Sequence, residues 1–198
     1  MIKFFRKTRY DLMEQNKTGK YIKYAIGEIV LVVIGIMIAL SINNWKEDLD
    51  DEKFISRIFY SIEKEMKSNE VEFNAVMPMQ FSLIDTIDQY MNDEKISLSE
   101  IIIRGNGLRA PTLNNVSWNY FLNTKLELID FNTISILTKI EQANQLLNSK
   151  ISNLMEFVLE NSESTNTKSK KMLKFQILNV VSSEKSLLDL HVEYLEKE

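Results

Sequence analysis

Several residue types that carry chemistry are missing or scarce in this 198-residue chain. It has no cysteine, which excludes disulfide bonds, thiol catalysis and zinc sites with cysteine ligands. It has a single histidine, His191, so a zinc site of ordinary composition is excluded as well. Five glycines and two prolines are too few for a turn-rich β fold or a disordered linker. These absences favour an ordered, all-α chain.

Charge is divided unevenly along the chain. Residues 1–24 carry seven bases and two acids, which gives this head a net charge of +5. The remaining residues carry 17 bases and 26 acids, which gives them a net charge of −9. A short basic head followed at once by an apolar run is typical of contact with a lipid bilayer that has anionic headgroups. We therefore expect lipid, and no nucleic acid, as the partner of the head.

An apolar run from Ala25 to Ile42 predicts a transmembrane helix. Its eighteen residues include one charged side chain, Glu28, and one further polar side chain, Ser41. Crossing the hydrocarbon layer takes about 20 residues, with about 17 as the lower limit, so the run is sufficient. Trp45 follows the run at a place where amphipathic rings prefer the membrane interface.

The charges on either side of the run predict its orientation. Basic residues precede it, whereas the segment KEDLDDEK (46–53) is mainly acidic, and positive charge favours the cytoplasmic side. The predicted domains are a cytoplasmic basic amphipathic head (1–24), a transmembrane helix (25–45) and an extracytoplasmic helical bundle domain (46–198). Two alternatives stay open, namely a signal peptide cleaved near Ala39–Ser41 and a buried helix of a soluble domain.

Glu28 needs an explanation, because an ionised carboxylate within lipid costs about 2.5–3.5 kcal/mol. It lies near the cytoplasmic end of the run, where its side chain can reach water or pair with a neighbouring lysine. Helical spacing offers a second interpretation, because small residues at Gly35 and Ala39 let a second helix approach on the side that carries Glu28. The predicted helix-packing face consists of Glu28, Val32, Gly35, Ala39 and Ile42.

The first residues of the head, IKFFRKTRYDLM (2–13), predict a short amphipathic helix. Apolar side chains gather on one side of it and bases on the other, which suits a helix lying on the cytoplasmic leaflet. The predicted lipid-surface contacts are Lys3, Arg6, Lys7 and Arg9. Docking of the head onto a cytoplasmic protein is the alternative interpretation.

Residues 46–198 show helical periodicity almost throughout, which predicts a globular helical bundle. Nothing in 43–53 forces a stop, so the transmembrane helix can continue into the first helix of this domain. Pro78 is expected to end that helix. A capping box at Ser97–Glu100 predicts a short helix. The predicted helices are 54–76, 80–92, 98–103, 117–123, 130–160 and 170–197, with loops at 104–112 and 161–171.

No constellation of catalytic, cofactor-binding or metal-binding residues is found in the sequence. We expect His191 to pack on an apolar face with one ring nitrogen hydrogen-bonded, and the many carboxylates to form solvated helix faces. Two glycines and two arginines in RGNGLR (104–109) leave two interpretations open. One is a plain turn, and the other is a contact of Arg104 and Arg109 with an anion or a partner.

The opening MIKFFRKTRYDLMEQNKTGKYIKYAIGEIVLVVIGIMIALSINNW resembles the start of a bacterial family of unknown function. Members of that family begin with a basic FFRK-type leader, continue with an AIGEI-LVVIGI span and end the span near INNW. The segment SWNYFLNTKLELI (117–129) resembles a stretch of the same family's downstream domain, except that the family often has Gly where this chain has Thr124 or Lys125. The resemblance implies a single-pass protein of a Gram-negative inner membrane. It does not point to any particular activity.

These observations predict a non-enzymatic, membrane-anchored protein whose external helical domain binds a partner or assembles into an envelope complex. The partner can be another protein or a second copy bound through the transmembrane helix. Two rival functions stay open: a sensory input domain, and an accessory subunit of an ion-driven membrane machine that uses Glu28. No cofactor is expected.

Overall fold

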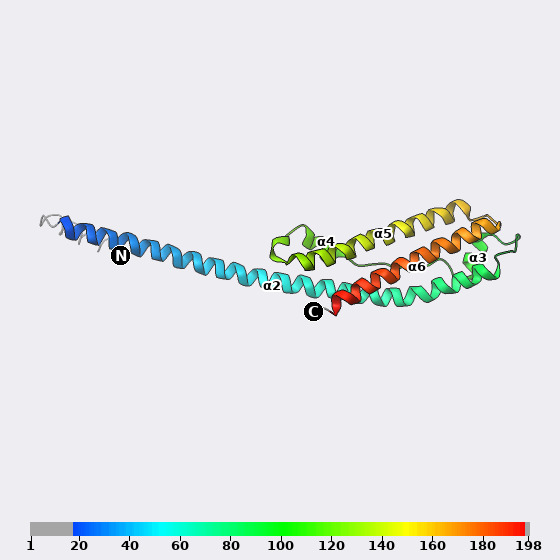
Figure 1. The fold of residues 1–198 in the computed structure, drawn as a ribbon, viewed down its shortest axis with the longest axis horizontal. Coiled ribbons are helices and arrows are strands. Elements are labelled where there is room, and N and C mark those ends of the chain that lie inside the picture. The colour runs from blue at the N-terminus through cyan, green and yellow to red at the C-terminus, as the bar shows by residue number, and fades with distance from the viewer. Residues whose placement is uncertain (1–17, 197–198) are drawn as a thin grey trace. The chain divides into compact units, whose positions relative to one another are not determined.

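The computed structural model describes residues 18–196, and within that range the chain is helical and contains no β-strand (Figure 1). The prediction of an all-α chain is confirmed for these residues. The predicted amphipathic helix at 2–13, with its four lipid-contact bases, lies outside them. The elements are α2 (Thr18–Gln89), α3 (Leu98–Arg104), α4 (Val116–Leu122), the 3₁₀ turn η1 (Leu126–Leu128), α5 (Phe131–Asn161) and α6 (Thr167–Leu195).

The chain divides into two compact units, Met1–Phe54 and Ile55–Glu198. Helix α2 begins in the first unit and ends in the second, so no break separates the apolar run from the helix that follows it in sequence. The prediction that the helix continues through residues 43–53 is therefore confirmed.

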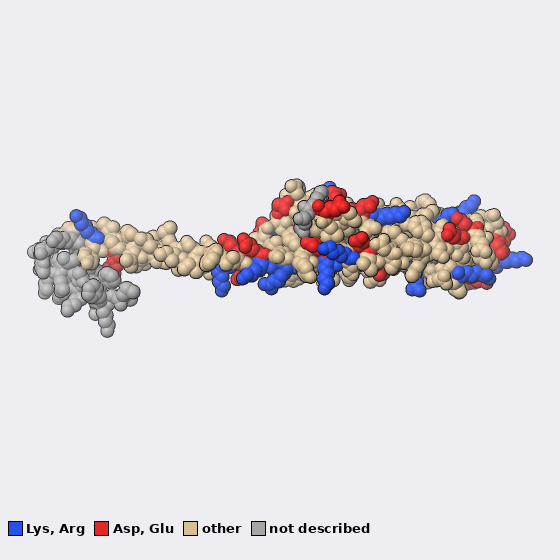
Figure 2. Space-filling view, turned by 90° about the horizontal axis from the view of Figure 1, so that it is seen from below, with Lys and Arg blue, Asp and Glu red and all other residues tan. Residues whose placement is uncertain are grey.

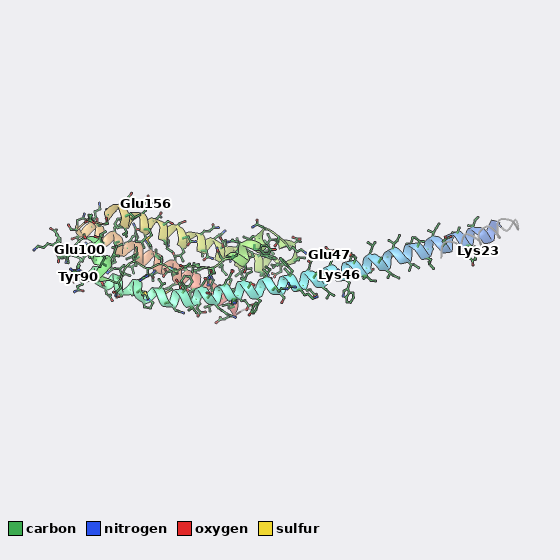
Figure 3. The ribbon with its side chains drawn as sticks, turned by 180° about the vertical axis from the view of Figure 1, so that it is seen from behind. Lys23, Lys46, Glu47, Tyr90, Glu100 and Glu156 are labelled. Atoms are coloured by element: carbon green, nitrogen blue, oxygen red, sulfur yellow. The ribbon has the colours of Figure 1, made fainter. Side chains whose placement is uncertain are left out.

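In the first unit, α2 is long and apolar enough to cross a membrane, and none of its most apolar stretch is buried. Figure 3 labels Lys23 before this stretch and Lys46 and Glu47 after it. On the face shown in Figure 2, uncharged side chains alone cover the middle of the stretch. Large apolar side chains therefore project away from the protein along the whole run.

The break predicted at Pro78 is wrong. Helix α2 runs through Pro78 to Gln89, so the separate helix predicted for 80–92 is the last part of α2. Proline in a helix interior costs about 3 kcal/mol, because it lacks an N–H group and clashes with the preceding turn. Phe73, Leu83 and Ile87 are fully buried on both sides of the proline, and their packing offsets that cost.

In the second unit, α5 and α6 form an antiparallel pair that lies beside the second half of α2 (Figure 1). The Nζ atom of Lys150 on α5 donates a hydrogen bond to Ser183 Oγ on α6 over 2.6 Å. The core is made of buried apolar side chains from all three long helices, with further contributions from the short ones. Its fully buried members include Phe73, Leu83, Ile87, Leu98, Ile101, Phe121, Leu147, Leu173, Ile177 and Leu187.

Side-chain caps define where the helices begin. The capping box predicted before α3 is confirmed, because Glu100 N donates to Ser97 Oγ (3.3 Å) and Ser97 N donates to Glu100 Oε2 (3.0 Å). Asp130 accepts from two backbone N–H groups at the start of α5, which confirms the predicted start of that helix. Asn166 accepts from Ser169 N and starts α6, so the solvated loop predicted for 161–171 ends earlier than expected.

Lys170 shows why that loop prediction was wrong. Its side chain is fully buried, although lysine is among the residues least often found inside proteins. The Nζ atom donates to the carbonyl oxygens of Tyr90 (3.1 Å) and Asp93 (2.5 Å), which follow the end of α2. An ammonium group offers several donors to the carbonyl groups at a helix end, where the helix dipole also favours a cation. Lys170 therefore fastens the first turns of α6 to the end of α2.

We predict that Lys170→Met lowers the free energy of unfolding of the helical domain by about 1–3 kcal/mol, because the end of α2 loses two hydrogen bonds from a buried ammonium group. Lys174→Met, one turn further along α6, is the matched control. Lys174 forms a partly exposed ion pair with Asp88, and such pairs contribute at most about 1 kcal/mol. Urea unfolding of the full chain in detergent, followed by circular dichroism, measures both. Equal effects of the two substitutions would contradict the role of Lys170.

Candidate functional site

The predicted helix-packing face lies in the apolar part of α2. Glu28, Val32, Gly35, Ala39 and Ile42 follow one another at steps of four, three, four and three residues, so they share one side of the helix. A Cβ atom added to Gly35 would meet no atom within 4 Å. The backbone at Gly35 is therefore open to close approach by a second helix, and this role of the face stays a prediction.

The two arginines of the RGNGLR segment meet α2 at different levels. Arg104 Nη1 donates to Tyr90 Oη over 3.3 Å, and its guanidinium lies 5.2 Å from the centre of the tyrosine ring. Arg109 instead has its carbonyl oxygen bound by Gln80 Nε2 at 3.1 Å. Tyr90 directly follows Gln89, the last residue of α2, whereas Gln80 lies nine residues before that end, a rise of about 14 Å. The side chain of Arg104 and the backbone of Arg109 are thus held at different places along α2. An anion or partner contact by either arginine stays a prediction.

Residues 105–115, which we call the strap, connect α3 to α4 and are held by polar side chains of α2. Asn69 is buried and pairs with the backbone of Asn114 in both directions. Its Nδ2 donates to the Asn114 carbonyl (2.9 Å), and its Oδ1 accepts from the Asn114 N–H (2.8 Å). About three turns further along α2, the side chain of the buried Gln80 donates a hydrogen bond to the backbone of the strap at Arg109. Both buried amides of α2 therefore serve the backbone of the strap.

Two carboxylates of α2 complete this attachment. Glu72 Oε1 accepts from the Thr112 N–H at 3.2 Å, and Glu65 Oε1 accepts from both the N–H (3.0 Å) and the hydroxyl (2.8 Å) of Ser117. The partners on α2 move back towards its N-terminus as the strap advances, so the strap runs antiparallel to α2. These carboxylates were predicted to form solvated faces, but Glu72 instead satisfies a backbone donor of the strap, and Glu65 satisfies a backbone donor in the first turn of α4.

Gly105 lets the strap begin close to α2. A Cβ atom at this position would lie 2.5 Å from Leu83 Cδ1 and 3.3 Å from Leu83 Cα. Asn106 (φ 65°) and Gly107 (φ 90°) then adopt left-handed backbone conformations that turn the chain into the strap. The glycines of this segment therefore serve a turn and a close contact, which agrees with the plain-turn interpretation of the sequence.

A cavity of about 20 Å³ lies where the strap, α2, α4, α5 and α6 meet. Seven of its twelve lining residues have polar or charged side chains, which is unusual for the core of a helical domain. The lining residues are Ile62, Glu65, Met66, Asn69, Asn114, Asn115, Trp118, Leu137, Ile140, Glu141, Asn144 and His191. In residues 18–196, no group of three or more His, Cys, Asp or Glu side chains is placed to hold a metal ion.

His191 is buried beside this cavity, and its ring lies 6.1 Å from the ring of Phe73 between centroids. Burial lowers the pKa of His191 to about 4, because the charged imidazolium loses its hydration. The predicted packing of this histidine is confirmed. Its Nδ1 atom, however, has no hydrogen-bond partner among the described residues.

A second buried polar contact joins α2 to α6. Gln80 Nε2 donates to Glu184 Oε1 over 2.7 Å, and the side chain of Glu184 is fully buried. Burial raises the pKa of Glu184, and the hydrogen bond from Gln80 opposes part of that rise. The sequence contained a signal for this residue, because Glu184 lies seven residues from both Ile177 and His191 on the apolar side of α6.

The close approach of Gly105 makes a testable prediction. Gly105→Ala is expected to lower the free energy of unfolding by about 1–3 kcal/mol, because the new methyl group overlaps Leu83 and forces the strap away from α2. Gly27→Ala is the control, since a Cβ atom there meets nothing within 4 Å. Urea unfolding in detergent compares the two. An unchanged unfolding midpoint for Gly105→Ala is incompatible with this contact.

The lowered pKa of His191 predicts a pH-dependent loss of stability. An unfolded histidine titrates near 6.5, so between pH 6.5 and about 4 the unfolded chain binds a proton that the folded chain does not. The free energy of unfolding should fall over this window by up to about 3 kcal/mol, and the fall should be absent in His191→Gln.

Urea unfolding at a series of pH values measures this difference. Glu184 contributes a slope of the opposite sign, since its pKa is raised by folding, but it is present in both proteins and cancels in the comparison. Parallel pH profiles for the wild type and His191→Gln would show that burial does not hold His191 neutral.

Comparisons with known proteins agree with the broad resemblance found in the sequence. Residues 28–127 match a family described as "Family of unknown function (DUF6090)", which covers just over half of the chain. No curated protein and no solved structure matches the chain. The matched range holds most of α2, the strap and Trp118, and it ends before α5 and α6. The chain therefore belongs to this family of unknown function, DUF6090.

Proposed function

We propose that this protein is a single-pass membrane protein whose helical domain binds a partner or assembles into a complex. The observation that carries the proposal is the exposure of the apolar run of α2. Its side chains from Ile29 to Ile42 are exposed, including Leu31 (63%) and Met37 (61%). Burying one such aliphatic side chain contributes about 1.5–3 kcal/mol, so a dozen of them outweigh the cost of placing Glu28 near the edge of the bilayer.

The charges flanking the run support an orientation. The basic head, with Lys3, Arg6, Lys7 and Arg9, lies on the cytoplasmic side against anionic headgroups, and the acidic helical bundle lies on the other side of a bacterial inner membrane, in the periplasm. The resemblance of residues 1–45 to bacterial envelope proteins supports the same assignment.

A binding role fits the helical domain better than catalysis does. Its polar side chains hold the backbone, as the buried Asn69 and Gln80 do for the strap and the half-buried Glu65 does for the first turn of α4. Catalysis instead needs a nucleophile, base or acid that converge on one accessible place. The domain is therefore proposed to act through its surface, without a cofactor.

The second part of the proposal concerns the helix-packing face of α2. We infer that Glu28, Gly35 and Ala39 contact a helix of a partner or of a second copy. A carboxyl group on the same side as two small residues can donate or accept a hydrogen bond across such a contact. The accessory-subunit alternative uses the same face, with Glu28 taking up and releasing a proton against the partner helix.

Cysteine crosslinking in membranes tests homotypic packing through this face. The chain has no native cysteine, so a single introduced cysteine reports on one position. Gly35→Cys is expected to give a disulfide-linked dimer under mild oxidation, whereas Met37→Cys, about 200° further around the helix, is expected to give little. Equal crosslinking at both positions, or at neither, would contradict homotypic packing through the Gly35 side.

Co-purification in mild detergent tests the role of Glu28. Glu28→Gln should weaken the recovered complex by about 0.6–2 kcal/mol if the carboxyl group bonds across the helix contact. Glu47→Gln, just beyond the run, is the matched control. If both variants recover their partners as the wild type does, the side chain of Glu28 only reaches towards water.

A further inference from the structure

The cavity beside His191 contains three polar atoms that no protein group satisfies. They are Trp118 Nε1, Asn144 Oδ1 and His191 Nδ1, none of which has a hydrogen-bond partner among the described residues. Their side chains are deeply buried, with exposed fractions of 4%, 3% and 1%. All three residues line the same cavity, although they come from α4, α5 and α6. A buried polar atom without a partner costs about 1–3 kcal/mol, so three around one space point to a ligand.

Four further polar side chains of the lining already have protein partners. Both ends of the Asn69 amide are bound by the backbone of Asn114. Glu65 accepts from Ser117, and Glu141 accepts from Asn115 and Gln145. The fully buried polar atoms of this lining that have no partner among the described residues are therefore the three on α4, α5 and α6.

We propose that this cavity binds one buried water molecule that joins Trp118, Asn144 and His191. The volume of about 20 Å³ suits this ligand, because about 10–15 Å³ of such space is enough for one water. A buried water usually makes about three hydrogen bonds, which equals the number of atoms that await a partner here.

The chemistry of the three atoms selects water over an ion. The indole N–H of Trp118 only donates, so it rejects an ammonium or metal cation, which has no acceptor to offer. The carbonyl oxygen of Asn144 only accepts, so it rejects an anion without a hydrogen. Water accepts from Trp118, donates to Asn144 and uses a remaining hydrogen or lone pair for His191 Nδ1. It therefore cross-links three helical segments through one molecule.

Nuclear magnetic resonance of the full chain in detergent micelles, with ¹⁵N-labelled tryptophan, tests this proposal. The chain has two tryptophans, so Trp45→Phe assigns the two indole signals. The Trp118 indole hydrogen is expected to show a cross-peak at the water frequency, with the sign of direct dipolar contact with a long-lived water. The cross-peak should be lost in Asn144→Leu, which replaces the acceptor with a larger apolar side chain.

Ser117→Ala provides the control for a false signal. The Ser117 hydroxyl neighbours Trp118 in the chain and exchanges its hydrogen with solvent, so it can imitate a bound water. A cross-peak that survives Ser117→Ala supports the buried water. Its absence in the wild type, its loss in Ser117→Ala, or a direct contact of the indole hydrogen with Asn144 would overturn the proposal. The wild-type and Ser117→Ala results decide the matter even if Asn144→Leu fails to fold.

Discussion

The need to remove the apolar side chains of residues 25–42 from water is the constraint on which the account of this protein depends. These side chains project from α2 without covering one another, and none of the most apolar stretch is buried by the protein itself. The proposed membrane span places them in hydrocarbon, where the helical backbone satisfies its own hydrogen bonds, as a lipid-spanning segment must. The position of Glu28 near one end of the run, and of charged residues beyond both ends, follows the same constraint.

A second constraint, the need of backbone groups for hydrogen-bond partners, shapes the helical domain. The strap crosses the domain without secondary structure of its own, and its backbone groups need partners. Asn69, Gln80 and Glu72 supply such partners from a single helix, in register with the antiparallel course of the strap, and Glu65 of the same helix binds the first turn of α4. The long helix α2 thus serves as the scaffold on which the strap, α4 and the cavity are arranged.

Periodicity and caps made much of this fold predictable from the sequence. The helices near 130–160 and 117–123, the capping box before α3 and the continuity of α2 beyond the apolar run all follow from local patterns. Pro78 could not be placed correctly, because burial of the turns on both sides of it outweighs its local preference. The burial of Lys170 and Glu184 was missed for a related reason. A charged residue is predicted to be solvent-exposed unless its partner is known, and here the partners, Tyr90 and Gln80, lie in a distant segment of the chain. The cavity is lined by residues of the strap and of four helices, which no local sequence pattern connects.

The accessibility of single cysteines on the two sides of the membrane tests the central claim most directly. One cysteine replaces Gln142, an exposed residue of α5, and another replaces Lys7 in the basic head. In Gram-negative cells whose outer membrane has been permeabilised, a maleimide that cannot cross the inner membrane should label position 142. The same reagent should label position 7 only after the inner membrane is disrupted. Labelling of both positions before disruption, or of neither, would contradict a span at residues 25–42 and with it the proposed function.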